Sequence, residues 1–244
     1  MTSSVSILAP AYNEEAVIRD FAQAVLREMP SGWELLIVDD GSTDATPELL
    51  RELSASHDAL RVVTHPRNKG LGEALRTGFS EAAGSVIVTI DADMSHPLHL
   101  LPVLVTACEE WDAAFGSRFV SGGGMEEVPF VRRMISRVGN VVLRLIFWSS
   151  VRDLTTGLRA YRADVIRNVP LESDRFEIQL EISVRLVSMG ARVTEIPLML
   201  KSRSAGESKM RYMALLPRYG RLVLRLLKIR WWQGTDTAID RVPT

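Results

Sequence analysis

The chain has 244 residues, of which 46% are hydrophobic, and a formal net charge of −1. This length suits one α/β domain around a single sizeable core, and the near-neutral charge removes any electrostatic argument for nucleic acid as a partner. The only cysteine, Cys108, excludes a disulfide framework within the chain, and the four histidines lack zinc-ligand spacing, so we expect a cytoplasmic protein.

Apolar runs and helical patterns alternate through the first half of the chain. Short runs that end at turn or acidic residues indicate buried strands, and apolar residues three or four apart indicate helices. This alternation predicts a Rossmann-like, mostly parallel sheet with helices on both faces and ligands beyond the carboxyl ends of the strands. The predicted strands are Val5–Ala9, Leu35–Val38, Leu60–Thr64 and Val86–Ile90, and the predicted helices are Ile18–Met29 and Leu71–Ala83.

The pattern is looser after Gly116, where Gly122-Gly123-Gly124 predicts a mobile loop. We expect one domain over residues 1–210, an amphipathic basic helix over 211–233 and a flexible tail over 234–244. The elements predicted in this half are helices near Phe130–Trp148 and Glu177–Met189, a strand near Val193–Leu198, and a last helix from about Pro217.

The sharpest chemical feature is the acidic segment after the fourth predicted strand. Asp91-Ala92-Asp93 places two carboxylates directly after Val86–Ile90. Carboxylate oxygens suit Mg²⁺ or Mn²⁺, which neutralise the oxygens of a diphosphate leaving group. An ordinary acidic turn would have the same sequence, so this segment alone leaves both interpretations open.

A second acidic pair, Asp39-Asp40, ends the strand Leu35–Val38 and favours the ligand-binding interpretation. Carboxylates at this position could accept hydrogen bonds from a base or a ribose hydroxyl. Helix capping by Ser42, Thr43 or Asp44 is the alternative for the residues that follow, but capping does not account for the aspartate pair.

The segment after the first strand carries a weaker signal. Tyr12 could stack on a nucleobase and Glu14 could accept a hydrogen bond from a ribose, whereas Asn13 could equally cap the first helix.

These segments resemble the successive motifs of family-two, GT-A-fold inverting glycosyltransferases, and the second half resembles the dolichol-phosphate (polyprenol-phosphate) mannose synthases. The resemblance covers about residues 5 to 210. The first-half segments are Ala9–Glu15, Val38–Ser42, Asn68–Gly72 and Asp91–Pro97; those of the second half are Gly116–Arg118, Ile135–Arg137, Gly139-Asn140, Asp153–Gly157, Gln179–Glu181, Arg203 and Gly206–Lys209.

For the donor, the resemblance implies a nucleoside site and a diphosphate site with a divalent metal, Mg²⁺ or Mn²⁺. Asp93 matches a metal ligand, Asp91 is a second candidate, and Ser95 stands where some relatives have Gln. The matching nucleoside positions are Pro10, Tyr12, Glu14, Val38 and Asp40, and the diphosphate positions are Asp91, Ala92 and Asp93.

The resemblance also implies residues that grip the acceptor or donor phosphates. Arg132 is preferred to Arg133 because of its spacing from Ser136. A guanidinium offers a planar fork of donors to phosphate oxygens, although an isolated arginine is usually solvated surface charge. The candidates are Arg118, Arg132, Ser136 and Arg203, to which the basic clustering adds Lys209.

The implied reaction is inverting, metal-dependent transfer of a sugar, most often mannose from GDP-mannose, to a polyprenyl phosphate. A phosphate acceptor attacks without prior deprotonation, so positioning and charge neutralisation dominate, and Glu181 is interpreted as a buried partner of an arginine rather than as a base. The alternatives are another donor such as UDP-glucose or UDP-GlcNAc, another acceptor, or a non-catalytic scaffold that binds lipid phosphate.

A membrane surface is the other expected partner. Met1–Val5 lacks the pattern of a secretory signal, and no apolar run of ~20 residues is present, so we expect peripheral association with the cytoplasmic face of a membrane, with a membrane-protein partner as a further candidate. Leu215 to Leu227 carries an apolar stripe beside a basic face, which fits an interfacial helix or a helix packed on the core. Val141–Trp148, interrupted by Arg144, is a second candidate.

Overall fold

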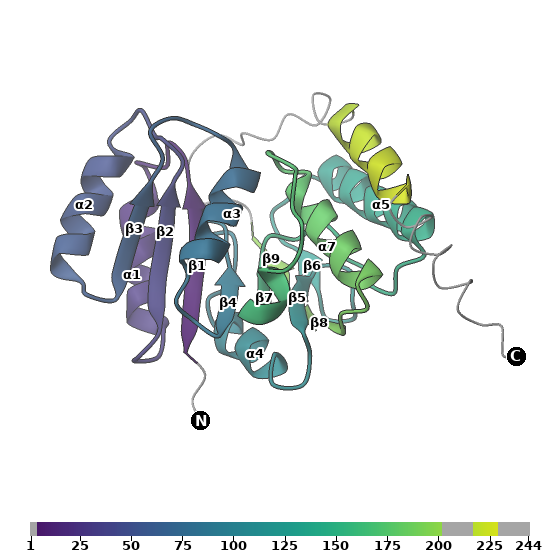
Figure 1. Ribbon diagram of the computed structural model, residues 1–244, viewed down its shortest axis with the longest axis horizontal. Coiled ribbons are helices and arrows are strands. Elements are labelled where there is room, and N and C mark those ends of the chain that lie inside the picture. Colours follow the sequence, from purple (N-terminus) through teal and green to yellow (C-terminus); the bar gives the residue numbers. More distant parts are fainter. Residues whose placement is uncertain (1–3, 202–216, 229–244) are drawn as a thin grey trace, which may run out of the picture.

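The computed structural model describes residues 4–201 and 217–228, so Arg203 and Lys209 lie outside the described residues. The described chain forms a seven-stranded sheet in the order β3-β2-β1-β4-β7-β5-β8, with helices on both faces (Figure 1). A two-stranded sheet, β6-β9, lies apart from it. This is the α/β architecture that the sequence predicts.

The first half follows the predicted alternation. β1, β2, β3 and β4 are parallel neighbours, and nearly all residues of β1, β2 and β4 are buried because helices cover both faces. The elements are β1 (Val5–Ala11), α1 (Ile18–Glu28), β2 (Glu34–Asp39), α2 (Thr46–Ser56), β3 (Leu60–Thr64), α3 (Leu71–Glu81) and β4 (Val86–Thr89).

The second half adds one antiparallel strand. β7 lies between β4 and β5 and runs antiparallel to both, whereas β5 and β8 are parallel. The elements are α4 (Leu100–Ala107), β5 (Ala113–Ser117), β6 (Gly124–Met125), α5 (Phe130–Phe147), β7 (Arg159–Arg162), α6 (Ala163–Ile166), α7 (Ile178–Ser188), β8 (Val193–Pro197) and β9 (Met199–Leu200). Six of these elements, α4, β5, β6, β7, α6 and β9, are not predicted from the sequence.

The glycine-rich segment predicted as a loop is closely packed at one point. Gly124 begins β6 and pairs with Met199 of β9. A Cβ at Gly123 would lie 2.3 Å from the backbone oxygen of Ser117, so only glycine fits there.

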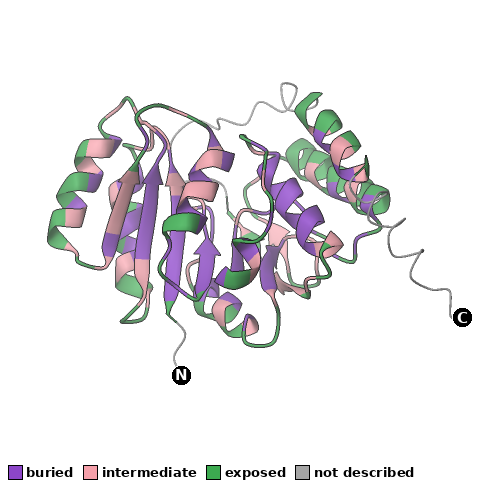
Figure 2. Ribbon diagram, in the orientation of Figure 1, coloured by how far each residue is buried: buried purple, intermediate pink, exposed green. Residues whose placement is uncertain are grey.

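The core has one layer on each face of the sheet. One layer packs α1, α2 and α4 against alternate residues of the strands, among them Ile7 and Ile37. The other packs α3, α6 and α7 against the intervening residues, among them Leu8 and Leu36. α7 is buried nearly all round, as its colour in Figure 2 shows, because it lies between the sheet and the helical residues 217–228.

Helical residues 217–228 agree with the predicted last helix, and their apolar stripe packs on the protein. Leu222 and Leu226 are buried in the second core layer, and Tyr219, Val223 and Leu227 pack against it at its margin. The described part of the stripe therefore follows the core-packing interpretation rather than the interfacial one. None of the helices in the described ranges is both long and apolar enough to cross a bilayer.

Candidate active site at the carboxyl edge of the sheet

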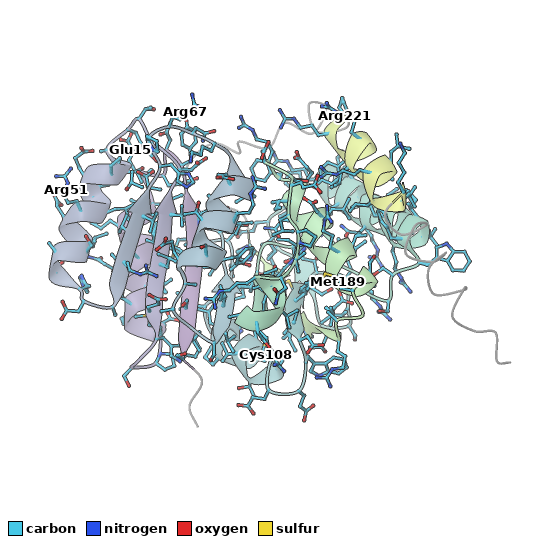
Figure 3. All side chains as sticks on the ribbon, viewed as in Figure 1. Glu15, Arg51, Arg67, Cys108, Met189 and Arg221 are labelled. Carbon is cyan, nitrogen blue, oxygen red and sulfur yellow. The ribbon has the colours of Figure 1, made fainter. Side chains whose placement is uncertain are left out.

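Three neighbouring strands end in residues that the sequence analysis singles out. β1 lies between β2 and β4, and the three strands are parallel. Tyr12 follows β1, Asp40 follows β2, and Asp91 comes shortly after β4, so all three belong to the same edge of the sheet. In Figure 3 the labelled Glu15 and Arg67 mark this edge.

The two aspartates at the end of β2 have different surroundings. Asp40 is buried and accepts hydrogen bonds from His65 Nδ1 at 2.7 Å and from the backbone nitrogens of Lys69 at 2.9 Å and Gly70 at 2.7 Å. Asp39 accepts hydrogen bonds from Ser42 through Oδ1, while its buried Oδ2 has no hydrogen-bond partner among the residues that the structure describes. Asp40 therefore fixes the turn before α3, and Asp39 keeps one orphaned buried acceptor, which is a feature of ligand sites.

The loop after β1 is tied to the loop after β2. The backbone nitrogen of Thr43 donates to Asn13 Oδ1 at 2.8 Å, and the backbone nitrogen of Asn13 donates to Ser42 Oγ at 2.9 Å. Asn13 has a φ of 52° and does not cap α1, whose N-cap is Val17. The capping interpretation of Asn13 is therefore wrong: its side chain joins the two loops that flank Tyr12 and Glu14.

The N-cap position of α2 is Ala45, which makes no side-chain cap hydrogen bond, and Asp44 Oδ1 accepts a hydrogen bond from the backbone nitrogen of Thr46, the first helical residue, at 3.0 Å. Pro10 and Val38, the remaining nucleoside candidates, are direct partners in the register of β1 and β2. The five nucleoside candidates thus lie on two adjacent strand ends and on the loops that these hydrogen bonds connect.

The turn after β4 presents its two carboxylates differently. Asp91 Oδ2 lies 3.1 Å from His96 Nε2, and its side chain is 42% exposed. Asp93 is buried and accepts a hydrogen bond from the backbone nitrogen of Ser95 at 3.0 Å. The backbone nitrogen of Lys201 donates to Ser95 O at 3.0 Å. This bond brings the chain to the acidic turn directly before the undescribed residues that contain Arg203.

The donor set at this turn fits a hard divalent cation that also binds substrate. Within residues 4–201 and 217–228, no group of three His, Cys, Asp or Glu side chains is placed to hold a metal ion. Mg²⁺ in nucleotide enzymes commonly takes one or two carboxylates and completes its octahedron with phosphate oxygens and water. Asp91 and Asp93 therefore fit a metal that binds together with a diphosphate.

A loop at residues 153–157 forms the other side of the site. Asp153 is buried and receives hydrogen bonds from Arg118 Nε and Nη2, both at 2.7 Å, and Arg118 Nη2 also donates to Thr155 Oγ1 at 3.0 Å. Burial acts to raise the pKa of Asp153, but the charge and hydrogen bonds of Arg118 outweigh it and hold that pKa below its ordinary value. Arg118 is thus anchored by an ionised carboxylate.

The same loop reaches the acidic turn. A Cβ at Gly157 would lie 2.7 Å from Asp91 Oδ2, and Thr89 Oγ1 donates to Gly157 O at 2.8 Å. The loop therefore contacts the donor-side carboxylate at one end and the candidate phosphate-binding Arg118 at the other.

Helix α5 joins the site through Asn140. Asn140 is buried, and its Nδ2 donates to Thr155 Oγ1 and to Ser136 O, each at 3.0 Å. Arg132 lies four residues before Ser136, which places both on the side of α5 that carries Asn140. The structure thus brings Arg118 and Ser136 to the same loop, and Arg132 to the adjacent turn of the helix.

Glu181 is part of the protein interior. Its Oε1 accepts from Arg185 Nε at 2.9 Å, and its Oε2 accepts from the backbone nitrogens of Glu172 and Ser173. Burial acts to raise the pKa of Glu181, but hydrogen bonds from Ser173, Glu172 and Arg185 bring it below its ordinary value. The interpretation of Glu181 as a buried partner of a helical arginine is confirmed.

Four residues of the site have no role assigned from sequence: His65, His96, Asn140 and Asp153. Asn140 and Asp153 stand in segments that resemble the mannose synthases, so their position in those segments was the available signal. His65 had none, because its role depends on a contact with Asp40 across 25 residues of sequence.

Comparisons with known proteins agree with this geometry. The dolichol-phosphate mannosyltransferase of Pyrococcus furiosus is 34% identical over 98% of this chain, which spans 66% of that relative's length. The undecaprenyl-phosphate mannosyltransferase of Micrococcus luteus is 35% identical over 84% of this chain and 87% of its own.

Among solved structures, glucosyl-3-phosphoglycerate synthase from Mycobacterium tuberculosis, in complex with Mn²⁺, UDP and glucosyl-3-phosphoglycerate, superposes with a TM-score of 0.69 at 20% identity. The match covers 94% of this chain and 80% of that one, which shows a shared fold. Residues 6–169, more than half of the chain, match glycosyl transferase family 2. The chain belongs to glycosyl transferase family 2 and is a glycosyltransferase.

Proposed function

We propose that this protein transfers mannose from GDP-mannose to a polyprenyl phosphate, with inversion at the anomeric carbon and with Mg²⁺ or Mn²⁺ bound. The observation that carries the proposal is the loop at residues 153–157, which contacts the acidic Asp91 at one end and the cationic Arg118 at the other. A donor diphosphate and an acceptor phosphate need these two charges side by side. The printed names of the curated relatives support mannose and a lipid phosphate.

On the donor side, the two loops joined through Asn13 would enclose the nucleoside. Tyr12 and Glu14 lie on the first loop, and Asp40 begins the second. The buried Asp39 Oδ2, which has no partner within residues 4–201 and 217–228, is an additional acceptor for a base or ribose donor. Because Asp40 is held by three hydrogen bonds, the nucleoside would meet a preformed surface.

Asp93 and Asp91 would hold the metal, with Ser95 or water completing the protein-side ligands. Such an ion neutralises the charge that develops on the leaving nucleotide diphosphate. His96 Nε2 lies 3.1 Å from Asp91 Oδ2 and restrains that carboxylate, and Asp93 is restrained by the backbone nitrogen of Ser95.

On the acceptor side, Arg118 would bind the phosphate and orient one oxygen toward the anomeric carbon. Ser136 and Arg132 would contact the same group from α5, with Arg203 and Lys209 as further candidates from the sequence. A phosphate monoester is already an anion at neutral pH, so no general base is needed and positioning supplies the catalysis. The engagement of Glu181 with Arg185 agrees with a site that uses no carboxylate base there.

The test is a donor screen against one polyprenyl phosphate in the presence of Mn²⁺, with products identified by mass spectrometry. We expect mannosyl phosphate lipid from GDP-mannose and none from UDP-glucose or UDP-GlcNAc, and we expect Asp93→Ala to abolish transfer. Transfer from a UDP-sugar alone would replace the proposed donor. Metal-dependent transfer by the Asp93→Ala variant at the wild-type rate would overturn the site assignment.

A non-catalytic scaffold is the competing class of function. Calorimetry with GDP separates the two, because the proposed enzyme binds GDP more tightly when Mn²⁺ is present and a lipid-phosphate scaffold has no such dependence.

We also propose that the protein associates with the cytoplasmic face of a membrane through an α5 apolar face. Of the 18 residues of α5, only Asn140 and Phe147 are buried. Figure 2 shows α5 exposed along much of its length beside the buried α7. The α5 apolar face consists of Phe130, Val131, Met134, Ile135, Val138, Val141, Val142, Leu145 and Ile146, continued by Trp148 just after the helix.

The charge of α5 fits an anionic lipid surface. The helix carries four exposed arginines and no acidic residue. An exposed apolar patch of this extent is unusual on a soluble monomer, and arginines beside it add attraction to anionic headgroups. This face includes most of Val141–Trp148, the second membrane candidate from the sequence, and it replaces the described part of the last helix, whose stripe is buried.

Co-sedimentation with vesicles of phosphatidylcholine and phosphatidylglycerol tests the α5 apolar face. Combined Val138→Gln, Val142→Gln and Leu145→Gln should reduce binding at least tenfold. The matched control is Val103→Gln with Leu224→Gln, which removes two exposed apolar side chains from other helices and should leave binding unchanged. Equal binding by the two variants would exclude α5 as the docking face.

A further inference from the structure

The side chain of Asn140 forms three hydrogen bonds within one buried cluster. Its Oδ1 accepts from the backbone nitrogen of Leu154 at 2.8 Å, and its Nδ2 donates to Thr155 Oγ1 and Ser136 O, each at 3.0 Å. One of these bonds lies within α5, and the other two cross to the loop at residues 153–157. Asn140 is the one buried polar residue of α5, and it ties the helix to that loop.

The Thr155 hydroxyl relays this connection to Arg118. Thr155 Oγ1 accepts from Asn140 Nδ2 and from Arg118 Nη2, both at 3.0 Å. Because two donors occupy the oxygen, its own hydrogen points to the remaining acceptor, Asp153 Oδ1, at 3.5 Å. A displacement of the Asn140 side chain therefore shifts the hydroxyl that orients the guanidinium of Arg118.

We propose that Asn140 is a positioning residue for the acceptor phosphate, setting the turn of α5 that carries Ser136 and Arg132 relative to Arg118. The proposal deepens the proposed function and rests on it. Asn140 does not touch the substrate in this arrangement. It acts through Thr155 on one phosphate-binding residue and through its own helix on two others.

The Asn140 amide both accepts and donates hydrogen bonds in this cluster, which neither an alanine nor an ionised aspartate side chain can do. Asn140→Ala removes the side-chain acceptor of the Leu154 nitrogen and one of the two donors to Thr155 Oγ1, and Asn140→Asp turns a carboxylate oxygen toward the Ser136 carbonyl. Thr155→Val removes the relay while keeping the side-chain shape, and Thr155→Ser keeps the hydroxyl.

The experiment measures the KM for a short-chain isoprenyl phosphate, the KM for GDP-mannose, and kcat, for each variant. Asn140→Ala and Thr155→Val should each raise the KM for the phosphate acceptor about tenfold and leave the KM for GDP-mannose within twofold. Thr155→Ser, which keeps the hydroxyl, should leave the KM for the phosphate acceptor near that of the wild type. The double variant Asn140→Ala/Thr155→Val should be no worse than Asn140→Ala alone, since both substitutions break the connection through Thr155.

Asn168→Ala is the matched control, because Asn168 Nδ2 also donates to the carbonyl four residues earlier, in an exposed position. It should change neither KM. A purely structural role for Asn140 predicts a lower melting temperature with both KM values unchanged in the folded enzyme, and this result would overturn the proposal. So would additive effects in the double variant.

Calorimetric binding of the isoprenyl phosphate keeps this inference separate from the proposed function. If the wild-type protein binds the phosphate but transfers no sugar to it, the proposed function fails, and tenfold weaker binding by Asn140→Ala would still support the positioning role. If wild-type transfer is normal and Asn140→Ala binds the phosphate as the wild type does, the positioning role alone fails.

Discussion

Asp91 lies against the α-carbon of Gly157, so close that a Cβ on the glycine would come within 2.7 Å of Oδ2 and 2.9 Å of Oδ1. Gly157→Ala should push the carboxylate aside and leave the fold intact, since the obstructing atoms are the end of a flexible side chain. We expect the affinity for GDP in the presence of Mn²⁺ to fall about tenfold, which corresponds to about 1.4 kcal/mol. Isothermal calorimetry measures this change.

Gly220→Ala is the control for that substitution, because nothing lies within 4 Å of a Cβ at this helical position. It should leave nucleotide binding unchanged and add about 0.5–1 kcal/mol of stability through helix propensity. Wild-type nucleotide affinity in the Gly157→Ala variant would show that the position of Asp91 does not matter for the donor.

The Arg118–Asp153 pair should give the protein an acid-sensitive contribution to stability. Asp153 has a pKa below its ordinary value in the folded state, so the pair stabilises the protein at neutral pH, and this contribution is lost as the pH falls below about 4. Asp153→Asn should cost about 3 to 5 kcal/mol at pH 7, because it leaves a half-buried guanidinium without its counterion. It should also flatten the acid limb of the stability curve. Urea unfolding at several pH values measures both effects.

Asp164→Asn tests the same chemistry on an exposed pair with Arg162, whose two side chains are 44% and 65% accessible. We expect no measurable change there. If the two substitutions lowered the free energy of unfolding equally, burial would not be the reason that Asp153 contributes to stability.

Cys108 should be unreactive in the native protein. Burial raises the pKa of its thiol to about 12, so almost no thiolate exists at pH 8, and the side chain lies at the edge of the sheet opposite the site (Figure 3). Iodoacetamide should label the protein fully in guanidinium and negligibly without it, as mass spectrometry can establish. Rapid labelling of the native form would mean that the α4 region opens frequently.

Glu181→Gln should reduce stability and leave the chemical step intact. Removing the charge breaks the buried half of this ion-pair cluster and leaves Arg185 with the exposed Glu172 as its remaining carboxylate among the described residues, which costs about 3 to 5 kcal/mol. Turnover by the folded variant at low temperature should stay near that of the wild type, far from the roughly 10²–10⁴-fold loss that follows removal of a general base. Thermal denaturation and single-turnover assays separate the two effects.

Glu172→Gln is the control in that cluster, since Glu172 also contacts Arg185 but is 53% exposed. It should destabilise the protein much less. A hundredfold loss of turnover in folded Glu181→Gln would assign that carboxylate to the chemistry.

Buried strands that consist mainly of β-branched residues can be predicted from the sequence, as for Val86 to Thr89 in β4. It misses β7, because the two arginines that flank Ala160 and Tyr161 suggest a surface segment. Arg159 is fully buried, with its guanidinium 4.2 Å from the centre of the Phe115 ring and bonded to the Leu154 and Gln179 carbonyls. Phe115 and Gln179 are distant from Arg159 in the sequence, so no local pattern predicts these contacts.

The two helices with membrane patterns show a second limit of sequence reasoning. An apolar stripe has the same periodicity whether it meets lipid or protein, so the stripe around Leu222 does not reveal that α7 lies beneath it. α5 carries a similar composition with its apolar residues outward. Only the position of each helix in the fold shows whether its apolar side is buried against protein or exposed. The grouping of the donor-side carboxylates can be predicted from the sequence alone, because they follow parallel strands whose carboxyl ends lie at one edge of the sheet.

The position of β7 between β4 and β5 also limits when the sheet can assemble during synthesis of the chain. The ribosome synthesises β4 and β5 well before Arg159–Arg162, so β4 has one unpaired edge in the nascent chain and β5, whose other neighbour β8 comes later still, has two. The sheet is sealed only when β7 inserts between them. Chains stalled before this point would offer one open edge of β4 and both edges of β5 to chaperones or to neighbouring nascent chains on the same messenger RNA.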